Sequence, residues 1–149
     1  MQRTALFPGT FDPYTIGHDA IVRRGLSLFD DIIIAIGVNI EKTTLFTLDE
    51  RVSAIQHLYS DEKRISITTY NTLTMDFARS LDIKFILRGI RNILDFEYEK
   101  NMATVHRQWS NIETVFLISE PEFAFISSSL LRDLILLNKD ISTLIPHKK

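Results

Sequence analysis

The chain has 149 residues, the size of one ordinary domain, and its 45% hydrophobic and 24% charged residues are typical of a globular protein rather than a disordered or fibrous one. Its formal charge of −2 provides no overall attraction to nucleic acid or to a membrane surface, so we expect neither as a partner and any anion site must be local. Cysteine is absent, which excludes disulfides, thiolate metal sites and cysteine nucleophiles, and without a basic-then-apolar leader the expected location is a reduced cytoplasm.

Apolar, β-rich runs alternate with helical patterns along the whole chain, so we expect a single domain over residues 1–149. The expected strands are Thr4–Phe7, Ile32–Val38, Ile65–Thr69, Lys84–Leu87 and Thr114–Ile118. The expected helices are His18–Phe29, Leu48–Tyr59 (with a capping box at Thr47–Glu50), Leu73–Ser80, Asp95–Gln108 and Ser128–Leu137. This alternation predicts a Rossmann-like α/β fold: a doubly wound parallel five-stranded sheet with helices on both faces. Such sheets bind ligands at the carboxyl ends of their strands.

The segment Phe7–His18 reads Phe-Pro-Gly-Thr-Phe-Asp-Pro-Tyr-Thr-Ile-Gly-His and joins the first predicted strand to the first predicted helix. Glycine and proline let backbone N–H groups approach an anion there, the helix N-terminus adds its positive dipole, and His18 brings a ring donor to the same point. The alternative is a tight turn with a capping histidine. The threonines that accompany His18, and Asp12, which is expected to order the loop, favour a phosphate site.

Three further motifs follow later strands. Arg88-Gly89-Ile90-Arg91 comes after the fourth strand, where two guanidiniums can grip phosphate oxygens, although a solvated basic turn would have the same sequence. Lys42 follows the second strand, in a position where most lysines are only solubilising charges. Three serines, Ser127–Ser129, open the last helix; one suffices as the N-cap, and the others supply additional donors.

One face of the fourth predicted helix is chemically mixed. Asp95, Glu99, Met102 and His106 follow the spacing i, i+4, i+7 and i+11, which places them on a single face. An acid, a thioether and an imidazole together are unusual for a core and for open solvent. The face therefore fits the wall of a ligand cavity, the alternative being a half-buried helix with a methionine as filler.

The first segment, Pro-Gly-Thr-Phe-Asp-Pro followed by Thr-Ile-Gly-His, resembles the signature of the nucleotidyltransferase superfamily, in the form used by the family of bacterial phosphopantetheine adenylyltransferases. Further segments resemble the same family in the same order, so that the resemblance spans nearly the whole chain. They are Phe46–Arg51, Leu87–Arg91, Asp95–Glu99 and Phe125–Ser129.

The resemblance implies an enzyme of coenzyme A biosynthesis that moves the AMP moiety of ATP onto 4′-phosphopantetheine, giving dephospho-CoA and pyrophosphate. It also implies Mg²⁺ as cofactor and a homohexamer. The catalytic residues that it implies are Thr10, His18, Lys42 and Arg91. The implied ATP-binding residues are Thr10, Phe11, His18, Gly89, Ile90, Arg91, Glu99, Phe123, Ala124, Phe125, Ile126, Ser127, Ser128 and Ser129. The implied acceptor-binding residues are Thr10, Lys42, Leu73, Thr74, Arg88, Met102 and His106. His106 stands where most relatives carry an amide, so acceptor contacts there are expected to depend on pH near neutrality.

Residue chemistry supports this type of reaction independently. A phosphate monoester is mostly dianionic near pH 7 and needs no general base, so positioning and charge stabilisation suffice for direct in-line attack without a covalent intermediate. No acidic cluster is evident, and Mg²⁺ is therefore expected to be carried by the ATP phosphates. Two alternatives stay open at this point. One is a sister enzyme acting on nicotinamide mononucleotide or glycerol phosphate. The other is a non-catalytic nucleotide-binding module, which would be expected to have lost His18, Lys42 or an arginine.

Overall fold

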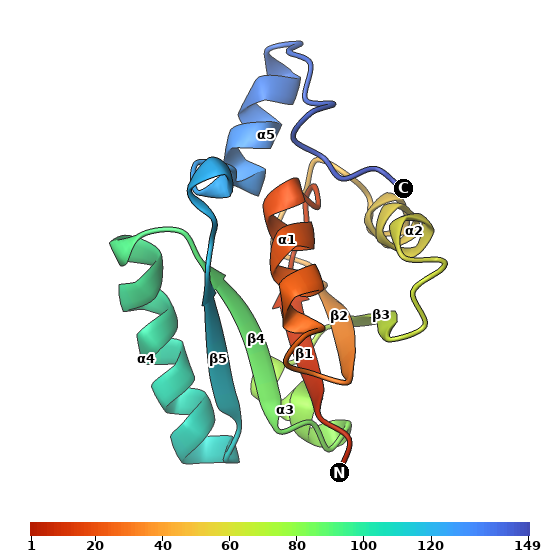
Figure 1. The fold of residues 1–149 in the computed structure, drawn as a ribbon. Coiled ribbons are helices and arrows are strands. Elements are labelled where there is room, and N and C mark those ends of the chain that lie inside the picture. The colour runs from red at the N-terminus through yellow and green to blue at the C-terminus, as the bar shows by residue number, and fades with distance from the viewer.

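The computed structural model describes all 149 residues and contains one five-stranded sheet, in the strand order β3-β2-β1-β4-β5 (Figure 1). All neighbouring strands are parallel. The strands are β1 (Thr4–Gly9), β2 (Asp31–Gly37), β3 (Ile65–Tyr70), β4 (Phe85–Ile90) and β5 (Glu113–Ile118). The helices are α1 (Ile16–Gly25), α2 (Leu48–Leu58), α3 (Thr74–Ser80), α4 (Ile93–Ser110) and α5 (Ser128–Leu136), with a 3₁₀ turn at Pro121–Phe123. The predicted Rossmann-like α/β fold is confirmed. None of the helices combines the length and apolar character needed to cross a membrane.

Two hydrophobic cores lie on opposite faces of the sheet, because successive residues of a strand point to opposite sides. In β1, Ala5 and Phe7 belong to the larger core, which α1 and α2 cover, whereas Leu6 belongs to the smaller one. Ala78 of α3 and Ile112, between α4 and β5, complete the smaller core. The sheet is therefore covered on both faces, as a parallel sheet requires.

The order of the strands places a switch point between β1 and β4. Through α1 and α2 the chain steps outward from β1 to β2 and then to β3, and through α3 it returns to the other side of β1. Connections that leave in opposite directions open a crevice at the carboxyl ends of the two strands. The N-terminus of α1 lies at the same end of the sheet (Figure 1).

Several predicted boundaries near this crevice were wrong. Strand β1 continues to Gly9 rather than ending at Phe7, and α4 begins at Ile93 rather than at Asp95. Helix α1 begins at Ile16 rather than at His18, because Thr15 is the N-cap and its side chain accepts the N–H of His18. Strand β4 continues to Ile90, since Arg88 and the two residues after it pair with β5. The strand thus includes most of the arginine motif instead of preceding it.

Helix α1 packs closely against the sheet because two glycines leave room for it. A Cβ on Gly25 would approach Leu87 Cδ2 to 2.6 Å, and a Cβ on Gly89 would approach Ile21 Cγ1 to 2.9 Å. Both distances are too short for a larger side chain without movement of the helix. Gly89, predicted as a close-approach position for a ligand, thus also makes space for α1.

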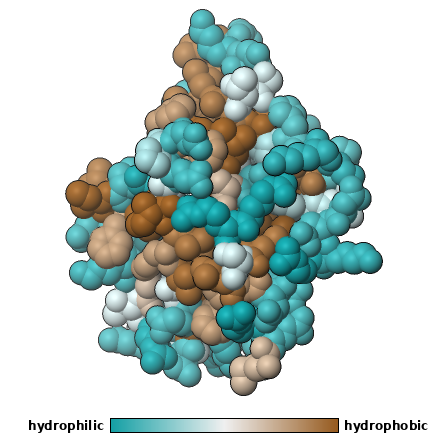
Figure 2. Space-filling model, viewed as in Figure 1, coloured by the Kyte–Doolittle hydropathy of each residue, from teal (hydrophilic) through white to brown (hydrophobic).

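Large apolar side chains remain exposed on α4 and at the end of α5. Figure 2 shows hydrophobic surface over the beginning of α4 and over α5. The exposed apolar residues of these helices that are at least 67% accessible are Ile93, Leu94, Tyr98, Trp109, Leu136 and Leu137. Exposed apolar groups gathered in this way mark surfaces that contact other molecules.

Candidate active site

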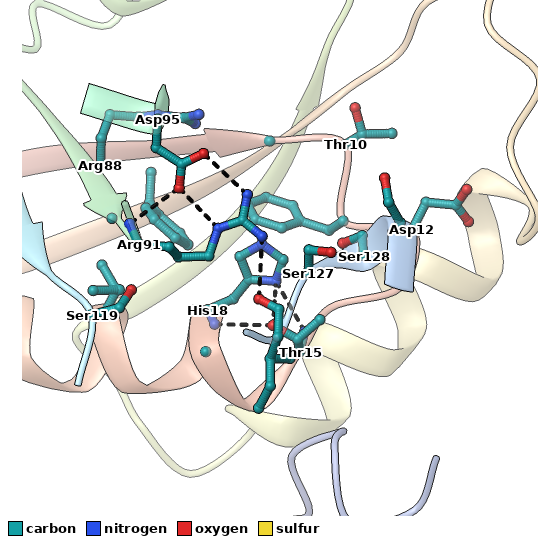
Figure 3. A pocket seen from close by; sticks show the side chains of 18 of the residues that line it. Thr10, Asp12, Thr15, His18, Arg88, Arg91, Asp95, Ser119, Ser127 and Ser128 are labelled. Atoms are coloured by element: carbon teal, nitrogen blue, oxygen red, sulfur yellow. Dashed lines mark hydrogen bonds and ion pairs between the residues drawn. The ribbon is translucent and has the colours of Figure 1, made fainter. Parts of the chain in front are cut away.

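A cavity of about 410 Å³ lies at the carboxyl ends of β1 and β4, beside the N-terminus of α1 (Figure 3). It contains most of the residues that the sequence predicted for a nucleotide site. The predicted residues that line it are Thr10, Phe11, His18, Lys42, Arg88, Gly89, Arg91, Glu99, Phe123, Ile126, Ser127, Ser128 and Ser129. Ile90, Ala124 and Phe125 do not line it, and the Phe125 side chain is 63% exposed.

His18 occupies the third position of α1, where it completes a capping box with Thr15. The His18 N–H lies 3.3 Å from Thr15 Oγ1, and the Thr15 backbone N–H donates to Nδ1 of His18 over 3.0 Å. Because Nδ1 accepts this hydrogen bond, a neutral ring carries its proton on Nε2, on the opposite side of the imidazole. The cap thereby makes His18 a hydrogen-bond donor toward the cavity.

The ring of His18 is neutral near pH 7. Burial, followed by the nearby guanidiniums of Arg88 and Arg91, lowers its pKa from 6.5 to about 3. Desolvation penalises the imidazolium, and the two positive neighbours repel it. In the free protein His18 therefore offers an N–H dipole and no full positive charge.

The loop between β1 and α1 is held in place by Asp12, whose side chain is 2% exposed. Its carboxylate accepts the backbone N–H groups of Leu45 and Phe46, each over 2.8 Å. The expectation that Asp12 orders the loop agrees with this geometry, and it also ties that loop to the segment preceding α2.

Two arginines that the sequence reading missed support the same loop. Arg51 of α2 donates to the Thr10 carbonyl over 2.8 Å, and Arg132 of α5 donates to the Asp12 carbonyl over 2.9 Å. Arg132 also lines the cavity. Each arginine stands at a position that is unusual for a cation. Arg51 shares the apolar face of α2 with Ile55, four residues later. Arg132 lies near the N-terminus of α5, where the helix dipole disfavours a cation.

The cations of the cavity are held by partners. Lys42 donates from Nζ to Thr10 Oγ1 over 3.2 Å. Arg88 donates to both carboxylate oxygens of Glu99, over 3.0 and 2.6 Å, and to the Pro8 carbonyl. Since a guanidinium has five N–H groups, two of those of Arg88 remain available to a ligand.

Arg91 is oriented in a similar way. Its Nε donates to Asp95 over 2.9 Å and a terminal nitrogen donates to the same carboxylate over 3.2 Å, as Figure 3 shows. A further N–H reaches the Ile126 carbonyl over 3.4 Å. The ion pair and the carbonyl fix the plane of the guanidinium before any ligand arrives.

Each serine of the triplet has its own partner. Ser127 is the N-cap of α5, as one serine was expected to be, and accepts the N–H of Leu130 over 3.1 Å. Ser128 donates to the Pro13 carbonyl over 2.8 Å, and Ser129 accepts from Arg132 over 3.0 Å. Ser128 therefore fastens α5 to the loop that follows β1, at the rim of the cavity, whereas the partners of Ser127 and Ser129 lie within α5.

The residues predicted for the acceptor's organic arm lie in two neighbouring cavities. Leu73 and Thr74 line one of about 790 Å³ that shares Thr10 and Lys42 with the main cavity. Met102 and His106 line one of about 120 Å³.

The smaller of these cavities shares Arg88 and Glu99 with the main one. His106 is 8% exposed and its Nδ1 has no hydrogen-bond partner. Burial lowers the pKa of His106, against an opposing effect of Glu99, so its titration moves below 6.5 and away from neutrality. The expected pH dependence of acceptor contacts at His106 stays a prediction, and the lowered pKa moves it to the acidic side of neutrality.

The chain is similar in sequence and in fold to known proteins. The model of the cytidylyltransferase-like family matches residues 6–134, which include every residue that lines the main cavity. The chain is 49% identical to the phosphopantetheine adenylyltransferase of Bacteroides fragilis over 97% of both chains, and 49% identical to that of Flavobacterium johnsoniae over 97% of this chain and 95% of the relative. A bifunctional NMN adenylyltransferase/ADP ribose pyrophosphatase from Francisella tularensis has a similar fold, with a TM-score of 0.74 at 14% identity over all of this chain and 46% of that one.

The lowered pKa of His18 predicts a dependence of stability on pH. Below pH 6.5 the unfolded chain binds a proton at His18 that the folded chain, with a pKa of about 3, does not bind, so stability falls as pH falls through this window. Between pH 7 and pH 5 the free energy of unfolding should drop by about 1–2 kcal/mol more in the unmodified protein than in His18→Gln. Urea unfolding at both pH values measures the difference. Equal losses in the two proteins would mean that folding does not keep His18 neutral.

Proposed function

Since this chain belongs to the cytidylyltransferase-like family, and within it to the phosphopantetheine adenylyltransferases, we propose that it transfers the AMP moiety of ATP to 4′-phosphopantetheine, giving dephospho-CoA and pyrophosphate. One observation carries the proposal. One cavity at the switch point of the sheet gathers four side chains suited to phosphate, which are His18, Lys42, Arg88 and Arg91.

The acceptor phosphate binds at the side of the cavity formed by Arg88, Thr10 and Lys42. Arg88 offers its two remaining N–H groups, and the hydroxyl of Thr10 lies beside the Lys42 ammonium, so that hydrogen bonds and charge converge on one anion. The pantetheine arm extends into the adjoining cavities, toward Thr74 in one and Met102 in the other.

ATP lies along the other side of the cavity. Its phosphates face His18 and the N–H of Gly17, because the neighbouring N–H groups of Ile16 and His18 already donate to the Leu144 carbonyl and to Thr15 Oγ1. The dipole of α1 favours an anion at this position. The nucleoside lies along Gly89–Arg91 and the segment Phe123–Ser129, with Glu99 between the two ligands because it pairs with Arg88.

Transfer proceeds by in-line attack of the acceptor phosphate on the α-phosphorus of ATP. A P–O bond forms to the acceptor, the bond to the β-phosphate oxygen breaks, and pyrophosphate leaves with the bonding electrons. The dianionic acceptor needs no base. His18 donates its Nε2–H to charge that develops on the α-phosphate, while Lys42 and Arg91 supply positive charge.

Mg²⁺ is the expected cofactor of this reaction. The protein has no group of three or more histidine, cysteine, aspartate or glutamate side chains placed to hold a metal ion. The cavity instead gathers cations and hydroxyls, a donor set that fits phosphate oxygens. When bound, Mg²⁺ is held by the oxygens of the ATP phosphates and withdraws negative charge from them.

The exposed apolar residues of α4 and α5 support a contact between subunits, which the homohexamer proposed for this protein requires. Action in the cytoplasm is part of the same proposal. Helix α5 is buried at one position and exposed at its end. Leu131 is fully buried, whereas Leu136 and Leu137 are 67% exposed, so the end of α5 is available for such a contact.

The substrate proposal is tested by pyrophosphate release from ATP with a panel of phosphorylated acceptors. We expect 4′-phosphopantetheine to exceed nicotinamide mononucleotide and glycerol phosphate by at least about 1,000-fold in kcat/KM, because only its arm fills the two adjoining cavities. Preference for nicotinamide mononucleotide would identify a sister enzyme. Tight ATP binding without pyrophosphate release from any acceptor would identify a non-catalytic module.

The role of His18 is tested with His18→Ala. We expect kcat to fall by about 100-fold or more while the Kd of ATP changes by less than about fivefold, because the Nε2–H acts mainly on charge that develops in the transition state. His57→Ala is the control, since His57 is exposed on α2 and lines none of the three cavities. Near-normal turnover in His18→Ala would remove His18 from the mechanism.

Light scattering tests the assembly. A homohexamer has six times the mass of the 17.2 kDa chain, and Leu94→Lys should reduce that mass because it places a charge on the exposed apolar face of α4. Gln56→Lys, which adds the same side chain at an exposed position of α2, outside both α4 and α5, is the control. A monomeric mass for the unmodified protein at micromolar concentration would refute the hexamer.

A further inference from the structure

The imidazole of His18 is enclosed by aromatic side chains. The ring of Tyr14 stacks on it, with centroids 5.2 Å apart and planes 29° apart, and Phe11 meets it edge-on at 5.1 Å. Phe7 completes the enclosure at 6.3 Å. The backbone N–H and the hydroxyl of Thr15 both contact the ring at Nδ1, over 3.0 and 3.1 Å. Because both contacts meet at one atom, the ring could still rock about it, and the stacked face of Tyr14 limits this remaining motion.

Tyr14 is itself held by a buried hydrogen bond. Its hydroxyl lies 2.8 Å from the hydroxyl of Tyr59, and the two tyrosines are 6% and 4% exposed. Tyr59 is the residue at which α2 ends, 45 positions away in the chain. Tyr59, which does not contact His18, thus fixes Tyr14, which does.

The direction of these bonds follows from Asp19. Tyr59 donates to Asp19 Oδ1 over 2.6 Å, because a carboxylate can only accept. Tyr59 has one proton, so its oxygen accepts from Tyr14. Burial raises the pKa of both phenols, which keeps both protons in place.

Asp19 returns the connection to its starting point. It directly follows His18 in α1, so Tyr14, Tyr59 and Asp19 form a closed path that begins and ends at the first turn of this helix. Arg23 donates to Asp19 over 2.9 Å and its guanidinium lies 5.6 Å from the centre of the Tyr59 ring. Arg23 therefore fixes the position of the Asp19 carboxylate and also contacts the face of the Tyr59 ring.

We propose that Tyr59 is a positioning residue for His18, which it fixes through the Tyr14 ring. Tyr59 does not line the main cavity and touches no substrate in the arrangement proposed above. Its hydroxyl sets the orientation of Tyr14, and the Tyr14 face sets the plane in which the Nε2–H of His18 points. This inference rests on the proposed function for its kinetic consequence, while its geometric consequence can be measured without substrate.

Tyr59→Phe removes the hydroxyl and leaves the rest of the ring in place. We expect kcat for adenylyl transfer to fall about tenfold while the KM values for ATP and 4′-phosphopantetheine change less than about twofold, because a donor that is misplaced by a fraction of an ångström loses transition-state contact and little ground-state binding. Ile83→Val, in the smaller core on the other face of the sheet, is the control for general destabilisation. It should lower Tm and leave kcat unchanged.

Two further measurements separate positioning from stability. Tyr14→Phe breaks the same hydrogen bond from its other side, so Tyr14→Phe/Tyr59→Phe should lose no more turnover than Tyr59→Phe alone. In ¹⁵N-resolved NMR of the free protein, His18 should show the Nε2–H tautomer, which Thr15 fixes, and Tyr59→Phe should keep this tautomer but shift the ring signals or broaden them by exchange.

The possible outcomes are distinct. An unchanged kcat in Tyr59→Phe, or a loss no larger than in Ile83→Val, together with an unchanged His18 spectrum, would overturn the positioning role. A changed His18 spectrum in a protein whose unmodified form does not turn over 4′-phosphopantetheine would support the geometry and reject the proposed function.

Discussion

The hydrogen bond from the Thr15 backbone N–H to Nδ1 of His18 links the fold of this protein to its chemistry. As part of a capping box it determines where α1 begins, and through the imidazole tautomer it determines which nitrogen faces the cavity. The same hydrogen bond therefore fixes both the start of α1 and the direction in which His18 donates. The surroundings act on the same ring: burial, followed by the guanidiniums of Arg88 and Arg91, keeps it uncharged, and its aromatic neighbours restrict its motion.

Several elements distant in sequence must hold the segment that carries Thr15. The buried Asp12 carboxylate ties it to the segment before α2, Arg51 reaches it from α2, and Arg132 reaches it from α5. Four backbone groups are satisfied in this way, two N–H groups by the carboxylate and two carbonyls by the arginines, although no regular element includes them. The loop can then present its own groups to a ligand without losing its shape.

The sequence predicted the layers of the fold well, because buried parallel strands and capped helices have strong local patterns. The capping box at Thr47 was recognisable, since its partner Glu50 is a usual one; the equivalent box at Thr15 was missed, because a histidine is its partner. The residues gathered in the main cavity were also largely predicted, from motifs at the ends of strands. Arg51 and Tyr59, which support the site from outside that cavity, were not predicted. The place of Arg51 on the apolar face of α2 indicated burial, but the contacts of these residues with Thr10 and Tyr14 span 41 and 45 positions, so no local segment identifies the partners.

The carboxylate partners of the arginines affect how long a ligand stays. The main cavity is lined by four cationic side chains, Lys42, Arg88, Arg91 and Arg132, and by three anionic ones, Asp12, Asp95 and Glu99. Most of the positive charge is therefore balanced before a phosphate arrives, and a polyanion meets directed N–H groups in a field close to neutral. A site of bare arginines would trap a released diphosphate for a long residence time. The internal ion pairs of this site keep its recognition of phosphate shape while weakening its hold on the departing product.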